Sequence, residues 1–122
     1  VFMNLIANAI DALEEMNEKR DTSKTANHTG RITITTALKG KQSVSVAIAD
    51  NAMGMNETVQ ARIFDHLFTT KAVGKGTGLG LAISHAIIVD KHGGTLCVNS
   101  EVGKGTEFVI TLPIVSDLAN AV

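Results

Sequence analysis

The chain has 122 residues, of which 44% are hydrophobic and 19% are charged, and its formal net charge at pH 7 is −1. A chain of this size and composition can bury one hydrophobic core, which excludes a disordered segment and favours a single domain. Its near-neutral charge and its few aromatic residues (four Phe, no Trp, no Tyr) argue against a nucleic-acid-binding surface and against attraction to an anionic membrane.

The first segment, VFMNLIANAIDALEEM, has apolar residues at helical spacing and predicts a helix that begins at Val1. No capping residue and no initiator Met precede this helix. We therefore expect the chain to be part of a longer protein, truncated on its N-terminal side. The predicted apolar stripe of the helix consists of Val1, Phe2, Leu5, Ile6, Ala9, Ile10, Leu13 and Met16.

Alternating patterns predict two β-hairpins. Residues 31–38 and 43–50 alternate and are rich in β-branched side chains, with the polar segment KGKQ between them. Residues 95–113 form a second pair of strands around the turn EVGKGT, and Pro113 closes the last strand. We expect residues 114–122 to form a frayed tail.

Two further helices are predicted between the hairpins. Asn56 has the chemistry of a helix start and precedes a short helix over residues 57–63. Apolar residues from Leu79 onward recur at helical spacing as far as Gly93 and Gly94, which are typical of a helix C-terminus. The order α, ββ, α, α, ββ predicts an α+β fold, a two-layer sandwich with the helices on one face of a mostly antiparallel mixed sheet.

The single cysteine, Cys97, excludes an internal disulfide and suits a reducing compartment. It lies in the apolar run GTLCVNS, so we expect a small buried hydrophobe rather than a reactive thiol. No signal peptide is visible, and no apolar run approaches the ~20 residues that a membrane span needs. These features predict a cytoplasmic domain without direct membrane contact.

Polar residues follow one face of the opening helix. Asn4, Asn8, Asp11 and Glu15 are spaced by four, three and four residues. A solvated face is the ordinary interpretation, yet asparagine in a helix costs about 0.5 kcal/mol relative to alanine. Amide oxygens are good ligands for a hard cation such as Mg²⁺. The spacing alone leaves both interpretations open.

Asp50 ends an apolar strand in the segment IADNAMGM. A carboxylate at this place can accept a hydrogen bond from the exocyclic amine of a ligand. Gly54 then permits a positive φ or a close backbone approach. An ordinary strand-ending Asp-Asn turn is the alternative.

The segment KAVGKGTGLGLAIS, residues 71–84, is rich in glycine directly before a predicted helix. Free amides and the positive dipole end of a helix bind phosphate, and Lys71 and Lys75 supply cations. A flexible linker is the alternative, although linkers do not usually merge into an amphipathic helix. The P-loop pattern fails because Gly76 follows Lys75 where Ser or Thr is required.

Taken in order, these segments resemble the ATP-binding catalytic domain of two-component sensor histidine kinases. NLIANAIDAL resembles the asparagine box, DNAMGM the first glycine box, IFDHLFTTK the phenylalanine box and GKGTGLGLAIS the second glycine box, while GTEFVITLP resembles the closing strand. The resemblance covers residues 1–113, which we expect to be the ATP-binding domain.

The resemblance implies a site for ATP and Mg²⁺. Asn8 would hold Mg²⁺, with Asn4 and Asp11 assisting at the phosphates. Asp50 would accept the adenine amino group, Gly54 would let the base approach, and Thr106 would support the same network.

The resemblance also implies a lid that closes over the triphosphate. Lys71 would meet a phosphate and act with Asn8 in catalysis, while Phe64 and Phe68 would anchor the lid. The residues expected to wrap the triphosphate are Gly76, Thr77, Gly78, Leu79 and Gly80.

By this resemblance, the γ-phosphoryl group of ATP would pass to a histidine on a dimerisation domain outside this chain, and then to a response regulator. The full-length protein would be a homodimer, with no nucleic-acid partner. In this family an acidic residue normally follows the phospho-accepting histidine. None of the four histidines here has such a neighbour, so the chain alone is not expected to autophosphorylate.

Two alternatives remain from the sequence. A gyrase-like ATP hydrolase has a glutamate, acting as a general base, one helical turn before the magnesium asparagine, and here Asn4 occupies that position. A degenerate nucleotide-binding regulatory module is the second alternative, because Ala52 replaces a glycine of the usual motif and Met53 and His66 are also atypical.

Overall fold

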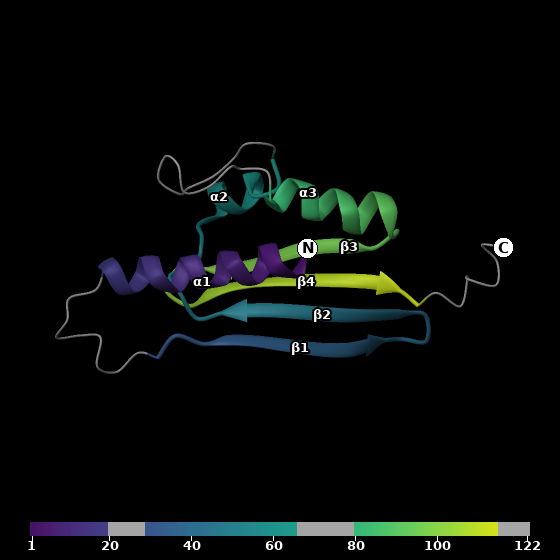
Figure 1. Cartoon of the computed structure of the whole chain (residues 1–122), viewed down its shortest axis with the longest axis horizontal. Helices are drawn as coiled ribbons and strands as arrows, with labels where there is room; N and C mark the ends of the chain where they lie inside the picture. Colours follow the sequence, from purple (N-terminus) through teal and green to yellow (C-terminus); the bar gives the residue numbers. More distant parts are fainter. Residues whose placement is uncertain (20–28, 66–79, 115–122) are drawn as a thin grey trace.

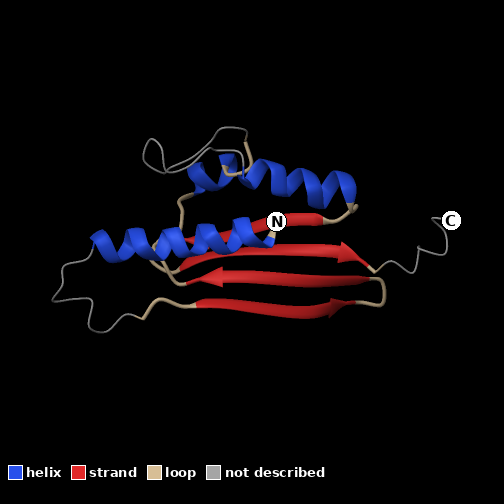
Figure 2. Ribbon diagram, viewed as in Figure 1, coloured by secondary structure: helices blue, strands red, loops and turns tan. Residues whose placement is uncertain are grey.

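Four strands form one antiparallel sheet in the computed structural model, which describes residues 1–19, 29–65 and 80–114. The strands are β1 (Ile32–Lys39), β2 (Ser43–Asp50), β3 (Thr95–Glu101) and β4 (Gly105–Pro113). Their order in the sheet is β1-β2-β4-β3, so the two sequence hairpins join through β2 and β4 (Figures 1 and 2). Both predicted hairpins are confirmed, and every pairing among the described strands is antiparallel.

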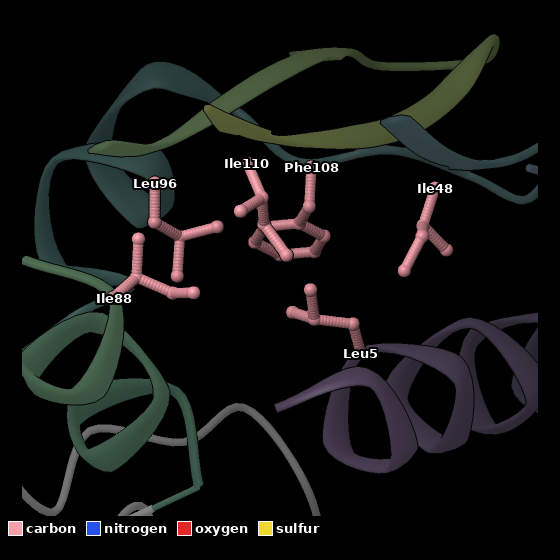
Figure 3. Close-up of a cluster of buried hydrophobic side chains, with 6 residues drawn as sticks. All are labelled: Leu5, Ile48, Ile88, Leu96, Phe108 and Ile110. Carbon is pink, nitrogen blue, oxygen red and sulfur yellow. The ribbon is translucent and has the colours of Figure 1, made fainter. Parts of the chain in front are cut away.

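Three α-helices and one π-helical turn complete the described elements. They are α1 (Phe2–Lys19), α2 (Glu57–Arg62), α3 (Gly80–Ala86) and the π-helical turn η2 (Ile87–Lys91). The close-up in Figure 3 shows that α1 and α3 lie beneath the same face of the sheet. The predicted two-layer α+β sandwich is confirmed.

Register divides the sheet into an apolar and a polar face. Ile48 of β2 pairs with Ile34 on one side and with Phe108 on the other, and Phe108 pairs with Val98. Directly opposed residues of antiparallel strands point to the same face, so the even-numbered residues of all four strands face the helices. The other face carries small or polar side chains such as Ser45.

Cys97 is exposed, so the prediction that it is buried is wrong. The apolar run around it suggested a strand buried on both faces. In the structure Leu96 and Val98 point to the helices, and Cys97 points to the open face because side chains alternate along a strand.

The core lies between the apolar face of the sheet and the helices. Its fully or almost fully buried members are Leu5, Ile48, Ile88, Leu96, Phe108 and Ile110. Figure 3 shows Leu5 of α1 directed at Phe108 and Ile110, while Ile88 of η2 meets Leu96. The core is thus mainly aliphatic, as expected for a sequence with few aromatic residues.

The predicted apolar stripe of α1 is too wide. Leu5, Ala9 and Met16 are buried, whereas Phe2 and Ile10 are 45% and 44% exposed. The buried residues are spaced by four and seven, which places them along one narrow line of the helix. Because α1 rests on a single sheet face, apolar side chains flanking that line stay partly in solvent.

The remaining helical predictions hold with one difference. Asn56 caps α2, since its Oδ1 accepts a hydrogen bond of 2.9 Å from the Val59 amide. The helix that begins by Gly80 changes from α to π at Ile87 and ends at the predicted glycines, where the Gly94 amide donates to Ile88 O. None of the described helices is long and apolar enough to cross a membrane.

The Ile110→Ala variant should lose about 3 kcal/mol of unfolding free energy, because Ile110 is 0% exposed and its removal leaves a cavity at the centre of the core. Ile34→Ala is the matched control, since Ile34 lies on the same face but is 54% exposed and should lose less than about 1 kcal/mol. Urea denaturation measures both changes. Equal losses in the two variants would contradict the core assignment.

Candidate functional site

The carboxylate of Asp50 lies at the end of β2 and is held by two backbone amides. Its Oδ1 accepts hydrogen bonds from the amide of Ala52 at 3.0 Å and from the amide of Thr106 at 3.3 Å. Thr106 is the partner of Asp50 across the β2–β4 pairing. Within the described residues no hydrogen bond reaches Oδ2, which leaves that oxygen as an acceptor for a ligand.

Burial raises the pKa of the Asp50 carboxyl, and the hydrogen bonds from the Ala52 and Thr106 amides lower it by less. Desolvation disfavours the charged form of a carboxyl group, so the ionised Asp50 is destabilising in the folded protein. A half-buried carboxylate that has an upward-shifted pKa, and one oxygen to which no described residue donates, is a candidate for ligand binding.

Asn51 ties the loop after β2 to the start of β1. Its Oδ1 accepts from the Arg31 amide at 2.7 Å, and its Nδ2 donates to Thr29 O at 2.8 Å. The Asn51 amide also donates to Arg31 O at 3.3 Å. Asn51 therefore continues the strand pairing for one step beyond β2 and fixes where the loop begins.

Gly54 and Gly105 let this loop touch the β3–β4 turn through backbone alone. Gly54 has φ +76°, and a Cβ on it would overlap the carbonyl of Glu101. Gly105 has φ +122°, and a Cβ on it would overlap the carbonyl oxygen of Asp50. The positive φ expected for Gly54 is confirmed, and the backbone that approaches it is the turn of the second hairpin.

Ser100 and Gln60 hold the same loop from two other directions. Ser100 Oγ accepts from the Met55 amide at 2.8 Å, donates to Gly105 O at 2.9 Å and lies 2.8 Å from Thr106 Oγ1. Gln60 Nε2, on α2, donates to Met55 O at 2.9 Å and to Ser100 O at 3.0 Å. The loop is thus attached to both β3 and α2.

Ser100, Gln60, Asn51 and Gly105 were missed by sequence reasoning. A signal for Ser100 exists in the register, because Asp50 pairs with Thr106 and Thr106 pairs with Ser100. These three residues form a polar row across β2, β4 and β3, on the face where the other side chains of these three strands are apolar. Predicting that row requires the pairing of β2 with β4, which local pattern does not supply.

Asn4 connects α1 with the first turns of α3. Its Nδ2 donates to Ser84 Oγ at 3.4 Å, and Ser84 is 0% exposed. A Cβ on Gly80 would lie 3.7 Å from Asn4 Cγ, so Gly80 and Asn4 are neighbours. Asn8 and Asp11 follow on the same face of α1 and are half-buried.

The structure brings the predicted site residues together in two groups. Asp50, Gly54 and Thr106 meet at the end of β2, while Asn4 and Gly80 meet where α1 contacts α3. Predicted ligands that lie outside the described residues are Lys71, Gly76, Thr77, Gly78 and Leu79, and the lid residue Phe68 and the atypical His66 lie there too.

Phe64 is the last predicted lid residue that the structure describes. Its ring centroid lies 4.9 Å from that of His85 on α3 and 6.4 Å from that of Phe108 in the core. The side chain therefore packs against the core just before the predicted lid begins.

A family model described as "Histidine kinase-, DNA gyrase B-, and HSP90-like ATPase" matches residues 1–116. Sporulation kinase E of Bacillus subtilis (strain 168) is 36% identical over 114 residues, which cover 93% of this chain and 13% of that protein. The chain therefore spans a small part of this curated relative.

Solved structures of histidine kinases have the same fold. The catalytic domain of histidine kinase ThkA, in a nucleotide-free form, matches with a TM-score of 0.67 at 32% identity and covers 90% of this chain and 62% of that one. Full-length ShkA in complex with AMPPNP matches with a TM-score of 0.60 at 32% identity, over 70% of this chain and 17% of ShkA.

The Asp50→Asn variant should gain stability relative to the wild type as pH rises. Because the pKa of Asp50 is raised from 3.8 in the folded protein, the folded protein binds more protons at Asp50 than the unfolded chain does between pH 3.8 and the folded-state pKa. The wild type therefore loses unfolding free energy as pH rises through the folded-state pKa, because Asp50 becomes ionised in its buried place. The asparagine variant has no ionisable group there and does not lose stability in this way. Urea denaturation from below pH 3.8 to neutrality measures the difference.

Asp90→Asn is the control for this series, because it removes the same charge from an exposed position. A difference between Asp50→Asn and the wild type that shrinks as pH rises would contradict the assignment of Asp50 as a desolvated carboxylate.

Proposed function

The chain belongs to the family of histidine kinase-, DNA gyrase B- and HSP90-like ATPases, as a catalytic ATP-binding domain of the sensor histidine kinase type, and from this premise we propose that it binds ATP with Mg²⁺ and donates the γ-phosphoryl group to a histidine. That histidine would belong to a dimerisation domain of the same protein, and a response regulator would receive the phosphoryl group next. We assign residues 1–113 to the ATP-binding unit.

The observation that carries the proposal is the geometry of Asp50. Its Oδ1 accepts hydrogen bonds from two backbone amides, so Oδ2 remains to accept a hydrogen bond from a ligand. The exocyclic amino group of adenine is such a donor, whereas guanine has a carbonyl oxygen at the same ring position, which a carboxylate repels. Thr106 lies beside Asp50 and would complete the adenine subsite. The complex of the related ShkA with AMPPNP supports an adenine nucleotide as the ligand.

The polar face of α1 fits a magnesium ion held mainly by phosphate oxygens. The described residues contain no group of three or more His, Cys, Asp or Glu that could hold a metal. A cation at this face would therefore take one or two protein oxygens and complete its shell with phosphate and water, which is how Mg²⁺ is usually bound with nucleotides. Asn8 would supply the protein oxygen, with Asn4 and Asp11 assisting at the phosphates. The bound ion would neutralise charge on the transferred group.

Asn4 supports phosphoryl transfer to a histidine over hydrolysis. Its amide cannot accept a proton from water, and it acts as a donor toward the buried Ser84. A neutral imidazole is already nucleophilic, so transfer to histidine requires positioning and charge neutralisation without a general base at this place. Lys71 would supply positive charge, and Gly76, Thr77, Gly78, Leu79 and Gly80 would wrap the triphosphate.

The surroundings of Ala52 favour a site that binds nucleotide over a degenerate module. Its side chain is 2% exposed and occupies a buried position that a small methyl group fills, and its amide still donates to Asp50. Met53 is partly exposed, and its carbonyl accepts a hydrogen bond from the Gly103 amide. The loop therefore keeps the contacts that hold Asp50 in place despite the changed residues. We place the domain in the cytoplasm, within a homodimeric full-length protein.

The purified chain should bind AMPPNP in calorimetric titration, more tightly with Mg²⁺ than with excess EDTA. Asp50→Asn should weaken AMPPNP binding by about tenfold or more, because the amide oxygen would accept from the two backbone amides and an NH₂ group would then face the ligand amino group in place of Oδ2. The same variant should bind inorganic tripolyphosphate as the wild type does. Equal loss of both ligands would contradict the adenine role of Asp50.

Asn8→Ala tests the metal ligand in the same titration and should remove most of the difference between Mg²⁺ and EDTA. Asn17→Ala is its matched control, because Asn17 lies on the same helix and is exposed. An unchanged magnesium dependence in Asn8→Ala, or the same loss in Asn17→Ala, would show that Asn8 does not hold the ion.

Phosphoryl transfer is tested with ATP that carries radioactive phosphorus at its γ-position. The full-length protein should acquire label that is lost in acid and kept in alkali, as expected for a phosphorylated imidazole. The chain of 122 residues alone should acquire none. Label on the isolated chain would show that it contains an acceptor, and steady release of inorganic phosphate would instead favour the hydrolase.

A further inference from the structure

We propose that Ser100 fixes the direction of the Thr106 hydroxyl proton and is thereby a positioning residue for the recognition of an amino-substituted purine at Asp50. The inference deepens the proposed function and rests on it, because it concerns the same nucleotide site. It assigns Ser100 no contact with the nucleotide.

The proton assignment follows from the three neighbours of Ser100 Oγ. A hydroxyl group has one proton to donate and two lone pairs that accept. The Met55 amide, at 2.8 Å, occupies one lone pair. Gly105 O, at 2.9 Å, is a carbonyl oxygen without a proton, so Ser100 must donate its own proton there.

Thr106 is therefore the donor in the remaining contact. Its Oγ1 lies 2.8 Å from Ser100 Oγ, where only the second lone pair of Ser100 is left. The proton of Thr106 is thus directed at β3 and away from any ligand beside Asp50. What Thr106 Oγ1 can offer to a ligand is lone pairs only.

The result is a site edge made of acceptors. Asp50 offers Oδ2, and Thr106, itself nearly fully buried, offers an acceptor next to it in the same row of the sheet. A ligand that presents an amino group can satisfy both, either directly or through a bound water. A ligand with a carbonyl oxygen at that position would place this oxygen against the two protein acceptors, with little water to separate them. Unpaired polar groups in a desolvated site give strong discrimination between related ligands.

Gln60 supplies a matched control within the same network. Its Nε2 donates to Met55 O and Ser100 O, so it joins the same loop to the same strand as Ser100 does. It has no part in the proton assignment of Thr106. Removing Gln60 loosens the loop and leaves the Ser100 hydroxyl in place, whereas removing the Ser100 hydroxyl frees the Thr106 proton.

The test compares the affinities of this chain for ATP and for inosine triphosphate, which has a carbonyl oxygen in place of the 6-amino group and a proton on N1. Calorimetric titration with Mg²⁺ gives both affinities for the wild type, Ser100→Ala and Gln60→Ala. The wild type should prefer ATP by about tenfold or more. Ser100→Ala should lower that ratio by about tenfold, because Thr106 can then turn its proton toward the 6-oxo group.

Gln60→Ala should keep the wild-type ratio even if it weakens both nucleotides and lowers the unfolding temperature. Ser100→Thr should keep the ratio because it retains the hydroxyl. If Ser100→Ala fails to fold, judged by circular dichroism, Ser100→Cys replaces it with a side chain of similar size that hydrogen-bonds weakly and should also lower the ratio.

A wild-type ratio that persists in Ser100→Ala or Ser100→Cys would overturn the inference while leaving the proposed function intact. A ratio lost equally in Gln60→Ala would show that Ser100 acts only by holding the loop. A folded wild-type chain that binds neither nucleotide would contradict the proposed function, and the inference with it.

Discussion

The pairing of Asp50 with Thr106, and of Thr106 with Ser100, is the constraint on which the candidate site depends. On the helix-facing side of the sheet, the neighbouring row contains Ile48, Phe108 and Val98, so the polar row marks the end of the core. A shift of β2 against β4 by one residue would turn Asp50 to the open face and place apolar side chains in solvent. The burial of the core therefore holds the carboxylate at its position.

Around this row, the site is shaped mainly by backbone groups. The Ala52 and Thr106 amides orient Asp50, and the two glycines, Gly54 and Gly105, bring the loop and the second hairpin into direct contact. Backbone groups make weak demands on side-chain identity, which explains how Ala52 and Met53 fit into a motif that usually has other residues. Asp50, Ser100 and Thr106 differ from these residues because they take part in the network through side-chain hydrogen bonds.

Local sequence pattern was sufficient for the elements of this fold. Both hairpins, the cap at Asn56 and the helix end at Gly93 follow from short-range chemistry, and the structure has them where they were expected. Cys97 was wrongly expected to be buried, because an apolar run does not reveal that one face of the sheet is left uncovered by the helices that the structure describes. Asp50 could be selected from sequence as a carboxylate at a strand end, whereas Ser100 and Gln60 could not. Their roles depend on contacts 40 to 45 residues away, which no local pattern contains.

The site thus combines two kinds of polar group that have different effects on stability. The Asn4 side chain donates a hydrogen bond to Ser84 Oγ between α1 and α3. This bond joins α1, which contains the proposed metal ligand, to α3, which follows the glycine-rich segment. Asp50 is only half satisfied, since burial raises its pKa while one of its oxygens has no partner among the described residues. A fold selected for stability alone would have a neutral side chain at that place. The residue that weakens the folded state is therefore the one that a ligand amino group would complete, and nucleotide binding should stabilise the folded protein.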